Sequence, residues 1–80
     1  MISDADKQGL IVGLKQVKKA LQNRTATKVF IADDCDFYLK KSLEELCEAA
    51  GIIPEVAGTM TELGSECGIS VKASCACVCR

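Results

Sequence analysis

The stretch KVFIADDCDFYLKKSLEELCEAAG, residues 28–51, joins a short apolar run to an amphipathic helix and thereby decides the fold. Its first five residues are mostly β-branched or aromatic, and two aspartates stop the run, so we predict a buried strand over residues 28–32. Asp36 is a suitable N-cap for a helix whose leucines recur at helical spacing, and Gly51 is a typical stop. This order of strand, turn and capped helix predicts an α/β unit.

The same alternation extends in both directions from this unit. Upstream, apolar residues at helical spacing predict a helix over about residues 14–23, opened by Gly13 and ending at Asn23. Downstream, the pattern predicts a strand, a helix with a capping box at Thr59 and Glu62, a loop and a last strand, at residues 52–57, 60–67, 69–74 and 75–79. We therefore predict a three-layer α/β/α sandwich around a small mixed sheet of about four strands.

The length and composition indicate one globular domain that covers residues 1–80. Of the residues, 49% are hydrophobic and 26% are charged, which excludes a disordered chain. No apolar run approaches the roughly 18 residues that cross a bilayer. The acidic start, residues 1–6, lacks the pattern of a signal peptide, so we expect a cytoplasmic protein.

The net charge of −1 hides a strong asymmetry along the chain. Residues 1–28 contain six Lys or Arg and two Asp, whereas residues 29–66 contain two Lys and nine acids. A polyanion would therefore bind near the N-terminal part. The acidic middle, with Glu44, Glu45, Glu48 and Glu55, is expected to be a solvated face away from any nucleic acid.

Two segments are candidates for binding. The basic segment, residues 13–19 (GLKQVKK), places Lys15, Gln16 and Lys19 on one exposed helix face. Lysine supplies charge to phosphates and glutamine can pair with base edges, although periodicity alone is equally typical of a solvated helix face. The second candidate is the distal loop, residues 68–74 (GISVKAS), whose small and apolar side chains could cover an unstacked base.

The order of a Gly-opened basic helix, an Ala-Asp-Asp strand end, a Leu-Cys-Glu helix and a Leu-Gly-x-x-Cys-Gly stretch carries a family resemblance. Over roughly residues 9–79 the chain resembles the ribosomal-protein family typified by the archaeal large-subunit kink-turn-binding protein. Its length is most similar to the short bacterial ribosomal-protein-like members. The resemblance implies a monomeric, non-catalytic RNA-binding protein that recognises kink-turns, in which tandem sheared G·A pairs lie beside a three-nucleotide bulge.

The resemblance also implies a set of RNA-binding residues. The basic helix would read the guanine edges, Asp36 would approach the flipped-out bulge nucleotide, and the distal loop would cover that base. The implied residues are Gly13, Lys15, Gln16, Lys19, Asp36, Ile69, Val71, Lys72 and Ala73.

Five positions depart from the family pattern. Lys15 and Gln16 stand where the family commonly has Asn and Glu, so charge assistance to the guanine contact is lost at Gln16. Met60 replaces a common Lys, and Val71-Lys72 replaces Arg-Pro in the distal loop. These departures predict weaker binding than in the archaeal proteins.

The six cysteines are expected to be packing residues. Cys75, Cys77 and Cys79 alternate along one strand and so share a face, where neighbouring Cα atoms, about 6.5 Å apart, are poorly placed for a disulfide. Neither a Cys-x-x-Cys pair nor any His is present, so we predict no metal site and no cofactor. The absence of His also lowers the expectation of an enzyme, and no catalytic residue is assigned.

Two other functions are compatible with the sequence. The acidic helices could form a protein-interaction module that has lost RNA binding, as in distant stress-response relatives of the fold. Alternatively, the C-terminal cysteines could serve a thiol-based metal or redox protein.

Overall fold

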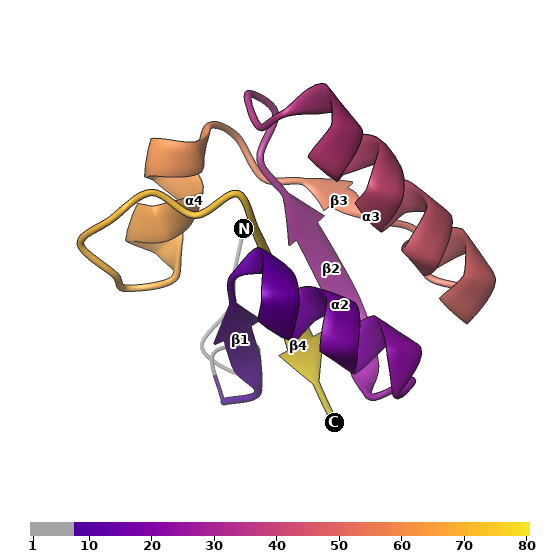
Figure 1. Ribbon diagram of the computed structural model, residues 1–80. Coiled ribbons are helices and arrows are strands. Elements are labelled where there is room, and N and C mark those ends of the chain that lie inside the picture. The colour runs from indigo at the N-terminus through magenta and orange to yellow at the C-terminus, as the bar shows by residue number, and fades with distance from the viewer. Residues whose placement is uncertain (1–7) are drawn as a thin grey trace.

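The computed structural model describes residues 8–80 and contains helices and strands in the alternation expected from the sequence (Figure 1). The acidic start of the chain, on which the expectation of no signal peptide rests, lies outside the described residues. The elements are β1 (Leu10–Val12), α2 (Leu14–Gln22), β2 (Ala26–Ile31), α3 (Phe37–Ala50), β3 (Glu55–Val56), α4 (Met60–Glu66) and β4 (Cys75–Cys79).

The strands form one mixed sheet in the order β1-β4-β2-β3. β4 lies in the centre and pairs antiparallel with β1 and with β2, whereas β2 and β3 are parallel. The register places Val12 opposite Ala76, and Ile31 opposite both Cys75 and Val56. Consequently β1, β2 and β3 end at the same edge of the sheet, and β4 begins there.

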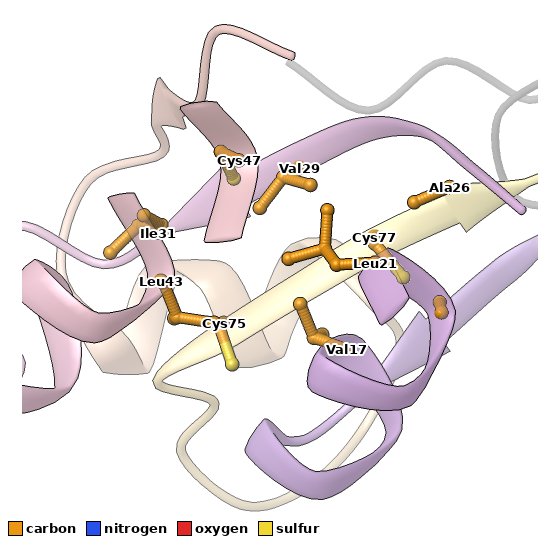
Figure 2. Packing of buried hydrophobic residues seen from close by; sticks show 10 residues of the cluster. Val17, Leu21, Ala26, Val29, Ile31, Leu43, Cys47, Cys75 and Cys77 are labelled. Carbon is orange, nitrogen blue, oxygen red and sulfur yellow. The ribbon is translucent and has the colours of Figure 1, made fainter. Parts of the chain in front are cut away.

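Two clusters of buried side chains on opposite faces of the sheet confirm the predicted three layers. On one face, α2 and α3 cover the sheet, and Figure 2 shows Cys75 and Cys77 of β4 between Val17 and Leu21 of α2 and residues of α3. On the other face, Leu63 of α4 packs against Phe30, Ala76 and their neighbours. Because β4 is buried on both faces, it consists only of Cys, Ala and Val.

The buried cysteines confirm the expectation of packing residues. Cys47, Cys75 and Cys77 have no exposed surface, and Cys79, which is partly buried, packs on the same cluster. Cys35 and Cys67 also contact the cores, and all six cysteines are free thiols. A small apolar side chain is what these positions require.

A bulge in β2 explains why two of its buried residues do not follow the alternation of a regular strand. Ala26 and Val29 belong to the same core although three positions separate them, whereas side chains of a regular strand alternate. The register shifts between Ala26 and Lys28, so Thr27 is an extra residue and donates its hydroxyl to the Val78 carbonyl at 3.1 Å. The strand therefore starts two residues earlier than predicted and still presents Val29 and Ile31 to α2 and α3.

Two strand predictions need correction. β1 was not predicted, because three apolar residues before a glycine carry no local strand signal, and β1 exists through its pairing with β4. β3 has two residues instead of the six predicted over 52–57. Ile52 donates its N–H to Cys47 O in the end of α3, and Pro54 has no N–H for a ladder.

The helix ends follow the local signals closely. The Asp36 side chain accepts from the N–H groups of Tyr38 and Leu39, and Thr59 with Glu62 forms the reciprocal capping box. Gly51 ends α3 in the left-handed conformation, with bonds from Ile52 to Cys47 and from Gly51 to Glu48 that define a Schellman motif. The caps at Asp36 and Thr59 stabilise the starts of α3 and α4 at the sheet edge.

Candidate nucleic-acid interface

The edge at which β1, β2 and β3 end and β4 begins is here called the loop edge; it comprises Gly13 and residues 32–36, 57–60 and 68–74. The chains at this edge are linked by backbone hydrogen bonds. Gly13 donates to Cys75 O at 3.2 Å, and Ala32 donates to Ser74 O at 2.9 Å. Segments far apart in the sequence thus meet where α2, α3 and α4 begin (Figure 1). Helix N-termini carry partial positive charge, which suits an anionic ligand.

The basic segment forms the start of α2, directly after Gly13, whose φ of 113° a side chain would disfavour. Lys15, Gln16 and Lys19 are exposed, whereas Val17 is fully buried in the core. Gln16 and Lys19 line one shallow groove of about 220 Å³, together with Ile11 of β1. The structure therefore places these two side chains on a common surface, as their spacing predicted.

Lys18 belongs to a different side of α2. Its side chain is partly buried. Burial raises the pKa of the Cys75 thiol, and the Ser74 hydroxyl and the Lys18 ammonium oppose this shift. Lys18 follows Gln16 by two positions, about 200° around the helix, so it faces a different side of α2 from Gln16.

Three aspartates lie at the loop edge, and each has a partner. The Asp33 carboxylate lies 4.0 Å from the Lys40 ammonium. Asp34 accepts from the Met60 N–H at 2.7 Å, and Asp36 accepts from the first turn of α3. The ion pair of Asp33 and the charge-dipole interactions of Asp34 and Asp36 reduce the repulsion that three carboxylates would exert on a polyanion. The sequence predicted the Asp36 cap but not the Asp34 bond, because Asp34 and Met60 are distant in sequence.

The distal loop presents three of its predicted residues to solvent. Ile69, Val71 and Lys72 line a groove of about 620 Å³ with residues of α4. Ala73 is different, because its side chain is 3% exposed and packs in the core beside Leu63. The expectation that the Ala73 side chain helps to cover a base is wrong in this geometry. Ala73 supports the loop from beneath, and its N–H donates to Met60 O at 3.0 Å.

Gly64 positions the distal loop, although sequence reasoning assigned it no role. A β-carbon at Gly64 would collide with the Val71 carbonyl. The loop also begins on this helix, since Ile69 donates to Gly64 O at 3.0 Å and Gly68 to Ser65 O at 3.0 Å. The Leu-Gly pattern in the sequence was the only available signal, and it did not indicate that the loop approaches the helix at Gly64.

The geometry gives the alternative metal hypothesis no donor set. Among residues 8–80, no cluster of three or more His, Cys, Asp or Glu is arranged to hold a metal ion. Burial raises the pKa of Cys77 to about 12 and that of Cys47 to about 11, so both are thiols at neutral pH. Within the same residues, no helix has the length and apolar character needed to span a membrane.

The mixed sheet, the helices on its two faces and the convergent loop edge define a class that comparison with known proteins identifies. The chain belongs to the Ribosomal protein L7Ae/L30e/S12e/Gadd45 family, whose model matches residues 2–80. This confirms the resemblance drawn from the sequence motifs.

Several individual proteins are similar to this chain. An RNA-binding protein of Caldanaerobacter subterraneus subsp. tengcongensis is 42% identical over 66 residues, which are 82% of this chain and 80% of that protein. The RNA-binding protein YbxF of Geobacillus stearothermophilus is 28% identical over 71 residues, or 89% of this chain and 87% of YbxF. A solved structure of a protein of unknown function from Bacillus halodurans C superposes with a TM-score of 0.83 at 30% identity, covering 91% of this chain and 73% of that chain.

Proposed function

We propose that this protein is a monomeric, non-catalytic, cytoplasmic RNA-binding protein, ribosome-associated or ribosomal-protein-like, that recognises and stabilises kink-turns in structured RNA. The family and the relatives that are named RNA-binding proteins support RNA as the ligand. One observation supports a particular RNA-binding site. Gln16 and Lys19 share a groove that runs along α2 to Asn23, and Gly13, just before α2, is bonded to the strand that follows the distal loop.

The basic segment is proposed to enter the opened major groove of the kinked RNA. A regular RNA duplex has a major groove too deep and narrow for side chains, and a sharp kink removes this obstacle. The Gln16 amide can then accept from a guanine N–H, while Lys15 and Lys19 contact phosphates or acceptor edges. Gly13 permits the close approach of the backbone because nothing lies within 4 Å of its missing side chain.

Asp36 and the distal loop are proposed to hold the flipped-out bulge nucleotide. Both cap bonds of Asp36 use Oδ1, at 2.8 Å and 3.4 Å, so Oδ2 is the oxygen that would accept from the base. Ile69 and Val71 offer apolar cover, and Lys72 offers charge to the adjacent phosphate. Met60, which stands where the family has Lys, provides its backbone carbonyl to hold the loop but no charge.

The physical result of this binding is a population shift. A free kink-turn exchanges with extended forms, and a protein that binds only the kinked form favours it by its differential affinity. No bond is made or broken in the RNA. This is the sense in which the protein is proposed to be non-catalytic.

A gel-shift titration tests the proposal with two RNAs, a kink-turn and the same RNA with its G·A pairs replaced. We expect clear preference for the kink-turn at physiological salt. Gln16→Ala should lower affinity for the kink-turn by about 5- to 150-fold and largely remove the preference, because a base contact contributes about 1–3 kcal/mol. Gln22→Ala is the matched control, since Gln22 is also exposed on α2 but lies at its last residue.

Lys18→Ala provides a second comparison. It should lower the affinity for both RNAs by the same small factor, because Lys18 contributes only a general electrostatic attraction. Equal binding of the wild-type protein to both RNAs would contradict specific recognition. A Lys18→Ala loss as large as that of Gln16→Ala would show that the assigned face of α2 is wrong.

A further inference from the structure

Two aromatic residues are exposed side by side at the start of α3. The chain contains only two Phe and one Tyr, and no Trp. Phe30 is buried in the core, whereas Phe37 is 69% and Tyr38 is 79% exposed. Their rings form an edge-to-face pair with centroids 5.8 Å apart and an interplanar angle of 77°. Most of the aromatic surface of this protein is thus presented to solvent at one place.

The fold itself does not require aromatic residues at these positions. Phe37 and Tyr38 belong to neither core cluster. The helix start is already satisfied by Asp36, which accepts from the backbone N–H of Tyr38. Adjacent exposed aromatic residues are uncommon on a protein surface without a ligand, because their apolar area remains in water. Their role is therefore to be sought in binding.

The position of the pair favours an RNA ligand. Phe37 follows directly after Asp36 of the loop edge, and residues 32–36 are bonded both to Ser74 and to Met60. One helical turn after Phe37 lies the exposed Lys41, on the same side of α3. An aromatic face beside a lysine matches a nucleotide, whose base stacks while its phosphate pairs with the ammonium.

We propose that Phe37 and Tyr38, with Lys41, form a stacking platform for an unpaired RNA base adjacent to the nucleotide at Asp36. This inference rests on the proposed function, which brings the kinked RNA to the loop edge. The platform has no hydrogen-bonding pattern that selects a base, so it accepts any base identity, with preference for purines because they stack more strongly. It extends the interface from the basic segment on α2 to the first two turns of α3.

Titrations of abasic RNAs test the platform. Each unpaired bulge nucleotide of a kink-turn RNA is replaced in turn by an abasic residue, which removes the base and keeps the phosphate. We expect the double variant Phe37→Ala/Tyr38→Ala to bind the intact RNA about tenfold or more weakly. At one bulge position, the abasic residue should lower the affinity of the wild-type protein by a similar factor. It should lower the affinity of the double variant only slightly further.

Tyr38 gives the platform its own spectroscopic readout. It is the only Tyr and the chain has no Trp, so protein fluorescence reports from this site alone. Stacking of a base should quench this emission, corrected for RNA absorption with free tyrosinamide, and the abasic RNA should quench it less. Tyr38→Phe should keep full affinity, because stacking does not need the hydroxyl group. Both residues are exposed, so far-UV circular dichroism of the variants should match that of the wild-type protein.

The outcomes separate the two proposals. Suppose that the wild-type protein prefers the kink-turn over the G·A mutant but the double variant binds with unchanged affinity. The platform is then overturned, the pair serves another partner, and the proposed function stands. The platform would also be overturned if the fold-loss in affinity caused by the double variant and that caused by the abasic RNA multiplied fully when combined. The two changes would then act independently. If the wild-type protein shows no preference for the kink-turn, both proposals fail.

Discussion

Arg24 shows how a single residue can hold an unfavourable backbone conformation. Among residues 8–80 it is the only non-glycine residue with a positive φ, at 57°. Thr25 donates to Ala20 O at 3.0 Å and Arg24 to Leu21 O at 3.2 Å, so α2 ends in a Schellman motif with Arg24 at the position that glycine normally occupies. The side chain is exposed and is not needed for packing.

Arg24→Gly should therefore increase the free energy of unfolding by about 0.5–1 kcal/mol. The left-handed conformation costs a residue with a side chain about 1–2 kcal/mol, and glycine removes this strain but loses more chain entropy on folding, which offsets part of the gain. Urea unfolding followed by circular dichroism measures this change. Arg24→Ala is the control, because it removes the charge but keeps the β-carbon, and it should not stabilise the protein. An equal gain in both variants would assign the effect to charge.

At the scale of elements, α4 and the distal loop act as one unit. α4 has only seven residues, yet it holds the loop through bonds to Gly64, Ser65 and Met60, and its Met60 N–H donates to the Asp34 carboxylate of the β2–α3 turn. These bonds connect α4 to two other parts of the loop edge. A change in α4 should be transmitted to the proposed RNA-binding loop.

Gly64→Ala tests this coupling. Its β-carbon would meet the Val71 carbonyl, so either α4 or the distal loop must move. We expect a loss of about 1–3 kcal/mol in stability, the usual range for overpacking, together with weaker kink-turn binding. Glu66→Gln, two positions along the same helix and outside the groove of the distal loop, should change neither quantity by much. Amide NMR shifts confined to α4, without change at residues 69–72, would contradict the coupling.

The elements also show which predictions local sequence could support. All three helices and the caps at Asp36, Thr59 and Gly51 agree with the prediction, because capping and periodicity depend on residues within one or two turns. The prediction missed β1 and gave the wrong length for β3, because these short edge strands are defined by their partners Val78 and Ile31. The common surface of Gln16 and Lys19 followed from helix geometry, whereas the burial of Ala73 did not follow from its loop sequence.

For the whole molecule, the doubly buried centre of the sheet links stability to pH. The pKa of Cys47 is raised to about 11 by burial and by nearby Glu44, and that of Cys77 to about 12 by burial and by Cys79. An unburied thiol has a pKa of 9.0. Below pH 9 the folded and unfolded states both hold these protons, so the two groups leave stability unchanged there.

Above pH 9 the unfolded chain loses these protons while the folded protein keeps them. The free energy of unfolding should then fall as the pH rises toward 11, by up to about 1.4 kcal/mol per pH unit for each thiol. Urea unfolding between pH 8 and pH 10.5 under reducing conditions measures the slope. Cys77→Ala should start less stable and show a shallower slope. An identical slope in this variant would mean that other groups cause the loss.

The charges of the whole molecule are separated in space as they are in sequence. α2 carries the exposed Lys15 and Lys19, whereas Glu44, Glu45 and Glu48 are exposed on the later turns of α3, and Glu55 on β3. The acidic residues thus form a solvated surface away from the start of α3, where Phe37 and Tyr38 lie. A net charge near neutral is therefore compatible with a binding surface for RNA.

The sequence by itself determined the helices, their caps, the exposed face of α2 and the apolar character of β4. These properties depend on periodicity and on hydrogen bonds between residues close in the chain, so they can be read locally. Only the tertiary structure decided the strand order, the bulge at Thr27, the burial of Ala73 and the meeting of Gly13, Asp36 and the distal loop at one edge. Those features depend on contacts between residues far apart in sequence, whose free energy exists only when both partners are in place.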